Sequence, residues 1–300
     1  MSPAPEGNCW LCNKYGKLTK EHIPPASAFN DFPLLFEKVV ERSKQTEVVE
    51  WEAEPRDRGL CFRSLCQKCN NNYGRLYGEA YVKLVKRISE RIGDVREFHK
   101  LSLFGIKRPL AILKQVMLQF VTANGANFVR SNDWVAPFIQ SRRNTDFPKD
   151  VYVYLFASNA PMSRNSGVAS HINLVERKTN VVSEFTFWPL GTVMSFSGEQ
   201  SDNRLTPIHQ WSQYPFDYAG SVDWDLSLNP VASAYPLDFR TAAEVKSTPM
   251  KAEDTNVTRP SDEDLREIIS KVIRISGEKD SWIWSGNPKT MRKIVDRKTR

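Results

Sequence analysis

Two pairs of cysteines constrain this chain more than any other feature of its sequence. Residues 9–12 read Cys-Trp-Leu-Cys and residues 66–69 read Cys-Gln-Lys-Cys. Four thiolates are the usual complement of a closed structural Zn²⁺ site, in which zinc is tetrahedral with Zn–S distances of roughly 2.3 Å. One zinc ion is therefore predicted to clamp together two segments that are far apart in the sequence. Its four ligands are Cys9, Cys12, Cys66 and Cys69.

Composition indicates a basic, globular, cytoplasmic protein. The chain has 300 residues, 40% of them hydrophobic, which is enough for about two domains. The net charge of +7 favours contact with a polyanion without requiring it. No secretory signal follows Met1 and no apolar stretch approaches the roughly 18 residues of a membrane span, so no membrane association is expected. The fifth cysteine, Cys61, is expected to be a small core residue.

Residues 1–100 are predicted to form a compact zinc unit. Residues 8–23 have the pattern of a β-hairpin, which two prolines end because proline cannot donate to a β ladder. Residues 26–60 are expected to be an insertion, with a short helix over residues 32–40 and a solvated loop after it. A second helix is predicted over residues 70–96, where apolar residues recur at helical spacing. The polar face of this helix is either a solvated surface or a phosphate-binding stripe, whose candidate nucleic-acid-binding residues are Arg75, Lys83 and Arg87.

Residues 101–300 are predicted to form a second domain of unknown role. Residues 109–123 predict a buried helix, and strand-like segments between residues 150 and 197 predict an antiparallel sheet. A last helix is expected over residues 261–277. The predicted fold class is therefore α+β, with an N-terminal zinc unit followed by a mixed domain that has an antiparallel sheet and flanking helices.

Two further segments of this second region lack a clear pattern. Residues 201–260 show no periodicity and are expected to be irregular, and the basic tail 289–300 is expected to be mobile. Aromatic side chains in and near the first segment either fill a core or line a ligand pocket. These aromatics are Trp188, Trp211, Tyr214, Phe216 and Trp224.

The residues between and beside the two cysteine pairs resemble a known nuclease family. Residues 21–24 read Glu-His-Ile-Pro, Asn70 directly follows the second pair, and Gly74 comes soon after it. Together with the four cysteines, this composite is similar to the four-cysteine branch of the HNH endonucleases, whose core is a ββα-metal or treble-clef unit. The resemblance covers residues 8 to about 90. It implies that the zinc unit carries nuclease activity.

The resemblance also implies roles for individual residues. The matching histidine of the family is the general base, so His22 is expected to activate water, and a neutral imidazole with a pKa of about 6.5 can accept a proton at physiological pH. The positions of Glu21 and Asn70 hold a catalytic Mg²⁺ or Mn²⁺ ion, which prefers oxygen ligands. Two alternatives stay open: Glu21 is structural, because adjacent residues of an ideal strand point to opposite faces, or Asn70 caps the helix.

One element of the family pattern is missing from this chain. Relatives commonly have a middle Asn on the approach to the second cysteine pair, where residues 58–65 contain none. Its orienting role is open to Asn71, to Asn72 or to a backbone carbonyl that holds the ring of His22.

These observations support a leading hypothesis and two alternatives. The leading hypothesis is a metal-dependent endonuclease that cuts DNA, and the sequence leaves RNA open as the target. Family analogy adds bacterial restriction or antiviral defence as its role. The first alternative is a catalytically silent zinc module that binds nucleic acid or protein. The second is a nuclease gated by a ligand sensor, or by a protein partner, through residues 101–300. The sequence leaves the oligomeric state open.

Overall fold

The computed structural model describes most of the chain. The described residues are 5–36, 54–92, 100–158, 163–173, 178–200, 202–227, 231, 239, 241–243, 262–277, 281–283 and 292–294. They form a mixed α+β protein with antiparallel sheets and helices, which confirms the predicted fold class. No helix among these residues combines the length and the apolar character needed to cross a membrane.

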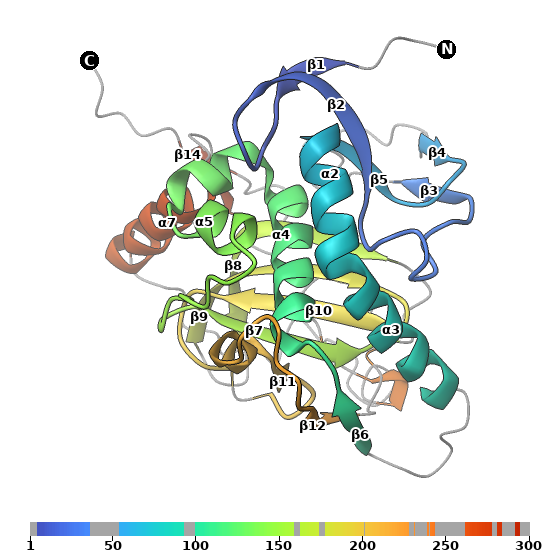
Figure 1. Cartoon of the computed structure of the whole chain (residues 1–300). Helices are drawn as coiled ribbons and strands as arrows, with labels where there is room; N and C mark the ends of the chain where they lie inside the picture. Colours follow the sequence, from blue (N-terminus) through green and yellow to red (C-terminus); the bar gives the residue numbers. More distant parts are fainter. Residues whose placement is uncertain are drawn as a thin grey trace.

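The N-terminal unit consists of a small sheet and the helix that follows it (Figure 1). Strand β1 (Glu6–Asn8) pairs antiparallel with β2 (Tyr15–His22), and the first cysteine pair lies in the turn between them. Strand β2 also pairs antiparallel with β5 (Cys61–Cys66). The chain then passes from β5 directly into a helix. The predicted hairpin is therefore confirmed, and β2, β5 and the helix form a ββα arrangement.

The helix after β5 begins earlier than its apolar pattern predicts. Helix α2 (Gln67–Tyr73) starts inside the second cysteine pair, a π-helical turn (Gly74–Gly78) follows, and α3 (Glu79–Ile92) continues from it. Cys66 is the N-cap of α2, so Asn70 lies within the helix. The alternative in which Asn70 caps the helix is therefore wrong. Residues 93–96, the predicted end of this helix, lie outside the described residues.

The insertion contains a pair of short strands where a helix is predicted. Strand β3 (Leu34–Phe36) pairs antiparallel with β4 (Glu54–Arg56). The helix prediction is wrong for residues 34–36, because their backbone groups pair with a distant segment instead of within their own turn. Residues 37–53 lie outside the described residues.

A five-stranded antiparallel sheet confirms the strands predicted between residues 150 and 197. In spatial order its strands are β11 (Thr206–Pro207), β7 (Tyr152–Ala157), β10 (Leu190–Ser195), β9 (Lys178–Phe187) and β8 (Arg164–Asn173). Val153 and Leu155 of β7 join the main hydrophobic cluster, whereas Tyr154 and Phe156 join a second one. Both faces of the sheet are therefore covered, which explains the continuous apolar run of β7.

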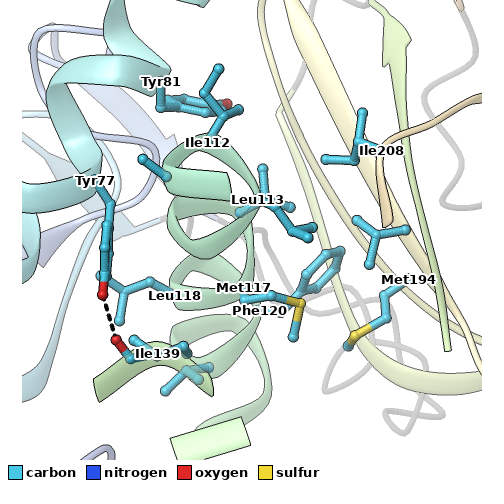
Figure 2. Close-up of a cluster of buried hydrophobic side chains, with 14 of the residues drawn as sticks. Tyr77, Tyr81, Ile112, Leu113, Met117, Leu118, Phe120, Ile139, Met194 and Ile208 are labelled. Atoms are coloured by element: carbon cyan, nitrogen blue, oxygen red, sulfur yellow. Dashed lines mark hydrogen bonds between the residues drawn. The ribbon is translucent and has the colours of Figure 1, made fainter. Parts of the chain in front are cut away.

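Helix α4 (Pro109–Ser131), whose backbone is non-helical at Gly125, is the centre of the main core, and its part before this kink confirms the predicted buried helix. It lies between the five-stranded sheet and the helix formed by α2 and α3 (Figure 1). In Figure 2, Met117 of α4 lies on the face of the helix that is turned towards Met194 of the sheet, and Leu118 lies on the face beside Tyr77. The Tyr77 hydroxyl donates a 2.7 Å hydrogen bond to the carbonyl of Ile139 in α5 (Val135–Gln140).

The main hydrophobic cluster joins residues from both sides of the expected domain boundary at residue 100. Leu65 and Tyr81 come from the zinc unit, and Leu113 and Met194 come from the second region. The core is therefore continuous across this position. The division into domains at residue 100 stays a prediction.

Two regions of the second half differ from the prediction. Strand β6 (Lys100–Ile106) pairs antiparallel with β12 (Val222–Ser227), so the latter segment is not irregular. Apolar and polar residues alternate in β12, which is a strand signal. Strand β13 (Ser281–Ile283) pairs with β14 (Arg292–Ile294). Residues 292–294 of the tail, for which mobility is predicted, therefore form a strand. Other tail residues lie outside the described ones.

The structure contains the last predicted helix and buries three of the five aromatic side chains singled out in the sequence. Helix α7 (Asp262–Ser276) confirms the helix, although the predicted N-cap at residue 261 lies outside the described residues. Three of the aromatic side chains that a ligand pocket would need, Trp211, Phe216 and Trp224, are buried in the main hydrophobic cluster. These three rings therefore fill the core.

Candidate active site

The four paired cysteines meet at one point of the zinc unit. Their Sγ atoms all lie within 4.8 Å of one another, and those of Cys12 and Cys66 are 3.8 Å apart. A tetrahedral zinc ion with Zn–S bonds of about 2.3 Å needs sulfur atoms about 3.8 Å apart. The donor set and its spacing therefore fit one structural zinc ion. Four thiolates fill its coordination sphere and leave no open position for substrate.

Backbone hydrogen bonds shape the first cysteine pair without help from a metal. The amide of Cys9 donates to the carbonyl of Lys14 at 2.9 Å, and the amide of Asn13 donates to the carbonyl of Cys9 at 2.8 Å. Asn13 has a left-handed φ of 56°, a conformation in which Asn is enriched. A hydrogen bond with Cys69 lowers the pKa of Cys9 to about 4, and the same contact raises the pKa of Cys69. Cys9 is therefore the member of this pair that releases its proton first, and the thiolate is the form that binds a metal.

A cavity of ≈ 320 Å³ lies between the end of β2 and the helix that follows β5. Its lining includes all three residues predicted to carry the chemistry, which are Glu21, His22 and Asn70. Adjacent residues of an ideal strand point to opposite faces, yet Glu21 and His22 both contribute to the wall of this one cavity. His22 is the last residue of β2, so the regular alternation of the strand ends there.

A backbone carbonyl orients the ring of His22. The Nε2 atom lies 3.0 Å from the carbonyl oxygen of Arg58. Because a carbonyl can only accept, Nε2 carries the hydrogen, and Nδ1 of the neutral ring is left with a lone pair. Of the candidates for the missing orienting group, the backbone carbonyl is therefore the one that contacts His22. Nδ1 is the atom of His22 that is able to accept a proton.

Asn30 holds the loop that presents the Arg58 carbonyl. Its side chain is fully buried, and its amide nitrogen donates to the carbonyls of Pro24 at 2.7 Å and Leu60 at 2.9 Å. Its Oδ1 accepts the amide of Leu60 at 2.6 Å. A Cβ on Gly59, whose φ is 71°, would lie 2.2 Å from the carbonyl oxygen of Asn30, so only glycine fits. Sequence reasoning missed Asn30, because no sequence signal pairs it with the segment before β5.

Asn70 attaches the helix to β2 and leaves its oxygen available. Its Nδ2 donates to the Thr19 hydroxyl and to the Lys20 carbonyl, both at 3.0 Å. The Lys20 carbonyl can only accept, so the nitrogen and not the oxygen must face β2. Within the described part of the chain, no hydrogen bond reaches Oδ1. This oxygen is therefore a candidate metal ligand.

Glu21 is the electrostatically unusual residue of the cavity. Only 5% of it is exposed, and its Oε2 has no hydrogen-bond partner within the described residues. Burial raises the pKa of Glu21 to about 8. A buried carboxylate without a partner costs several kcal/mol, and a cation in the cavity would remove that cost. The environment of Glu21 therefore fits a carboxylate that binds a cation.

This environment predicts that the contribution of Glu21 to the stability of the zinc-loaded protein falls as the pH rises from about 5 to about 8. The pKa of Glu21 is raised from its ordinary value of 4.5 to about 8 in the folded state. Between these values the folded state keeps a proton that the unfolded state releases, so a rise in pH favours unfolding. Melting temperatures measured from pH 5 to 9, with and without Mn²⁺, check this slope.

The variant Glu21→Gln is the comparison for this experiment. It removes the titrating group, so the fall in melting temperature between pH 5 and 8 should shrink. Mn²⁺ should raise the melting temperature of the wild type at pH 8 and leave that of Glu21→Gln unchanged. A slope that Glu21→Gln does not alter would show that other groups cause it.

The residues predicted to bind nucleic acid lie outside this cavity. Arg75 and Lys83 are exposed on the helix and Arg87 is half-buried, and none of them lines either of the two cavities described here. A larger groove of ≈ 660 Å³ lies instead along β2, β5 and the start of α2, and its lining contains cations and no acidic residue. These cations are Lys17, Lys20, Arg63 and Lys68. Sequence reasoning missed them because they come from separate elements.

Comparison with known proteins adds no family assignment. No protein-family model, no curated protein and no solved structure matches the chain. The likeness to HNH endonucleases therefore depends on the motif residues and on the chemistry of the cavity that contains them.

Proposed function

We propose that this protein is a metal-dependent endonuclease of the HNH type that hydrolyses phosphodiester bonds of DNA. One observation carries the proposal: His22, Glu21 and Asn70 line a single cavity, in which Glu21 has a buried oxygen without a partner. A base beside a ligand set for a hard metal ion is the minimum that metal-assisted hydrolysis requires. A module that only binds nucleic acid needs neither group.

His22 is the general base of the proposed reaction. Nε2 donates its hydrogen to the Arg58 carbonyl oxygen, 3.0 Å away, so Nδ1 takes the proton of the attacking water. The imidazolium that forms keeps its hydrogen bond to Arg58. Glu21 and Asn70 would hold a Mg²⁺ or Mn²⁺ ion, which supplies positive charge for the negative charge that develops on the phosphate oxygens.

The structural zinc has a separate role in the proposal. Its ligands come from the turn before β2 and from the junction of β5 with α2. Zinc would therefore hold β2, which carries His22, against the helix that carries Asn70. Two metal sites with different chemistry result, one with sulfur ligands for structure and one with oxygen ligands for catalysis.

The charge of the molecule supports a polyanionic substrate. The groove lined by Lys17, Lys20, Arg63 and Lys68 shares Lys20 with the catalytic cavity. Phosphates bound along this groove would lead a strand towards His22. The net charge of +7 agrees with this interpretation. We extend the proposal to restriction or antiviral defence by family analogy alone.

Cleavage assays on the zinc-loaded full chain test the proposal. Single- and double-stranded DNA and RNA are incubated with Mg²⁺, with Mn²⁺ or with a chelator of weak zinc affinity. DNA cleavage that needs the divalent ion is the expected result. Salt-dependent binding of nucleic acid without cleavage in any ion would contradict the proposal and favour a silent zinc module.

A further inference from the structure

The lining of the catalytic cavity includes a buried polar side chain that the proposed mechanism does not use. Gln115 lies on α4, beyond the expected domain boundary at residue 100. It lines the same cavity as Glu21 and Asn70 and is only 1% exposed. Neither its Oε1 nor its Nε2 has a hydrogen-bond partner within the described residues. A buried amide without partners destabilises the folded protein, so a ligand in the cavity that supplies a partner would be stabilising.

The preceding residue of α4 is a buried polar group whose partners all belong to the protein. Lys114 is fully buried, and its Nζ donates to the carbonyls of Ser141 at 3.0 Å and Asn144 at 2.7 Å, and to that of Phe138. Its three hydrogens thus have protein acceptors. Gln115 has no comparable set of partners. A molecule or ion bound in the cavity would therefore be the partner for its amide.

The local backbone leaves Gln115 open to the cavity. Gly78 ends the π-helical turn and also lines the cavity. A Cβ at this position would lie 3.7 Å from Gln115 Oε1 and 3.9 Å from Pro25 Cγ, so a side chain here would stand between the helix and the amide. π-Helical turns occur frequently at functional sites. Glycine at residue 78 therefore keeps a polar wall of the cavity uncovered.

We propose that Gln115 binds the hydration shell of the divalent ion that Glu21 and Asn70 hold, its amide oxygen accepting a hydrogen bond from one of the waters. This inference rests on the proposed function. Two protein ligands leave several coordination positions of Mg²⁺ or Mn²⁺ to water, and these waters need acceptors. Gln115 is thus a positioning residue, and the second region of the chain completes the site of the zinc unit.

Titration of the zinc-loaded full chain with Mn²⁺, followed by calorimetry, tests this role without reference to cleavage. Gln115→Leu keeps the approximate size of the side chain and removes both polar groups. Its Kd for Mn²⁺ should rise about 10- to 100-fold, the usual effect of losing an outer-shell partner. Its melting temperature without Mn²⁺ should be equal to or above that of the wild type, because an unpartnered amide is removed. Gln115→Glu, which adds a charged acceptor, should bind Mn²⁺ more tightly than the wild type.

Gln119→Leu is the matched control, because Gln119 is equally buried one turn further along α4 and its amide also lacks hydrogen-bond partners within the described residues, but it does not line the cavity. Lining the cavity is therefore the feature that separates Gln115 from Gln119. It should keep the Mn²⁺ affinity of the wild type. Equal affinity of Gln115→Leu and wild type would overturn the inference about Gln115 and leave the proposed function intact. Failure of the wild type to bind Mn²⁺ would overturn both. Mn²⁺ binding by the wild type without DNA cleavage would overturn the proposed function alone, and the titration would still decide the role of Gln115.

Discussion

His22→Ala should lower the rate of DNA cleavage in Mg²⁺ by about 10²- to 10⁴-fold, the usual contribution of a general base. The substitution removes the Nδ1 lone pair that the 3.0 Å contact between Nε2 and the Arg58 carbonyl leaves free. Zinc content and Mn²⁺ affinity should stay at their wild-type values, because His22 is not a ligand in either proposed site. Initial rates on a labelled duplex, with zinc measured by elemental analysis, check this expectation.

Asn71→Ala is the control for this prediction. Asn71 is exposed on α2, and it is one of the residues that sequence reasoning offers for the missing orienting role. Because the Arg58 carbonyl already contacts His22, the cleavage rate of Asn71→Ala should equal that of the wild type. Unchanged cleavage by His22→Ala would sink the assignment of His22 as the base.

Cys69→Ser should remove the structural zinc and most of the stability of the zinc unit. Cys69 is buried, with its Sγ within 4.8 Å of the other three ligand atoms. Structural zinc contributes about 10–16 kcal/mol in zinc-finger peptides, which is as large as the whole stability of a typical domain. The variant should therefore contain less than one equivalent of zinc, melt at a much lower temperature and lose nuclease activity. Elemental analysis and thermal unfolding measure the first two effects.

Cys61→Ser is the control for Cys69→Ser, because it removes a thiol that is not one of the four proposed zinc ligands. Cys61 pairs with His22 in the register of β2 and β5, is half-buried, and lies outside the four-cysteine cluster. This variant should keep one equivalent of zinc and most of the melting temperature of the wild type. A full equivalent of zinc in Cys69→Ser, or none in the wild type, would refute the four-cysteine site.

Local patterns predict much of the fold because they reflect short-range physics. The turn at the first cysteine pair, the strands between residues 150 and 197 and the helix α7 all follow from spacing and alternation. The prediction fails at residues 34–36, which pair with a strand far along the chain. It also fails at β12, where an alternating pattern lies within a segment that otherwise has no periodicity. Pairing with a distant partner overrides local preference at residues 34–36, whereas the pattern of β12 agrees with its structure and is only short.

Of the candidate site, too, the sequence predicts only some of the residues. Sequence reasoning names His22, Glu21 and Asn70, because their residue types and spacing match a motif. It does not find Asn30, which acts through hydrogen bonds to backbone on both sides of the insertion. It does not find Gln115 either, because a glutamine in an apolar helix has no pattern of its own.

The sequence alone therefore determines which functional groups are present: four thiols that could hold a metal ion, and the histidine, carboxylate and amide of the proposed second site. Only the tertiary structure decides which atoms of these groups are available. Nδ1 of His22 is free because a distant carbonyl occupies Nε2, and Oδ1 of Asn70 is free because β2 occupies its nitrogen. Burial raises the pKa of Glu21, and the packing of α4 brings Gln115 to the same cavity. Burial and hydrogen bonding depend on long-range contacts, which residue type and spacing do not specify.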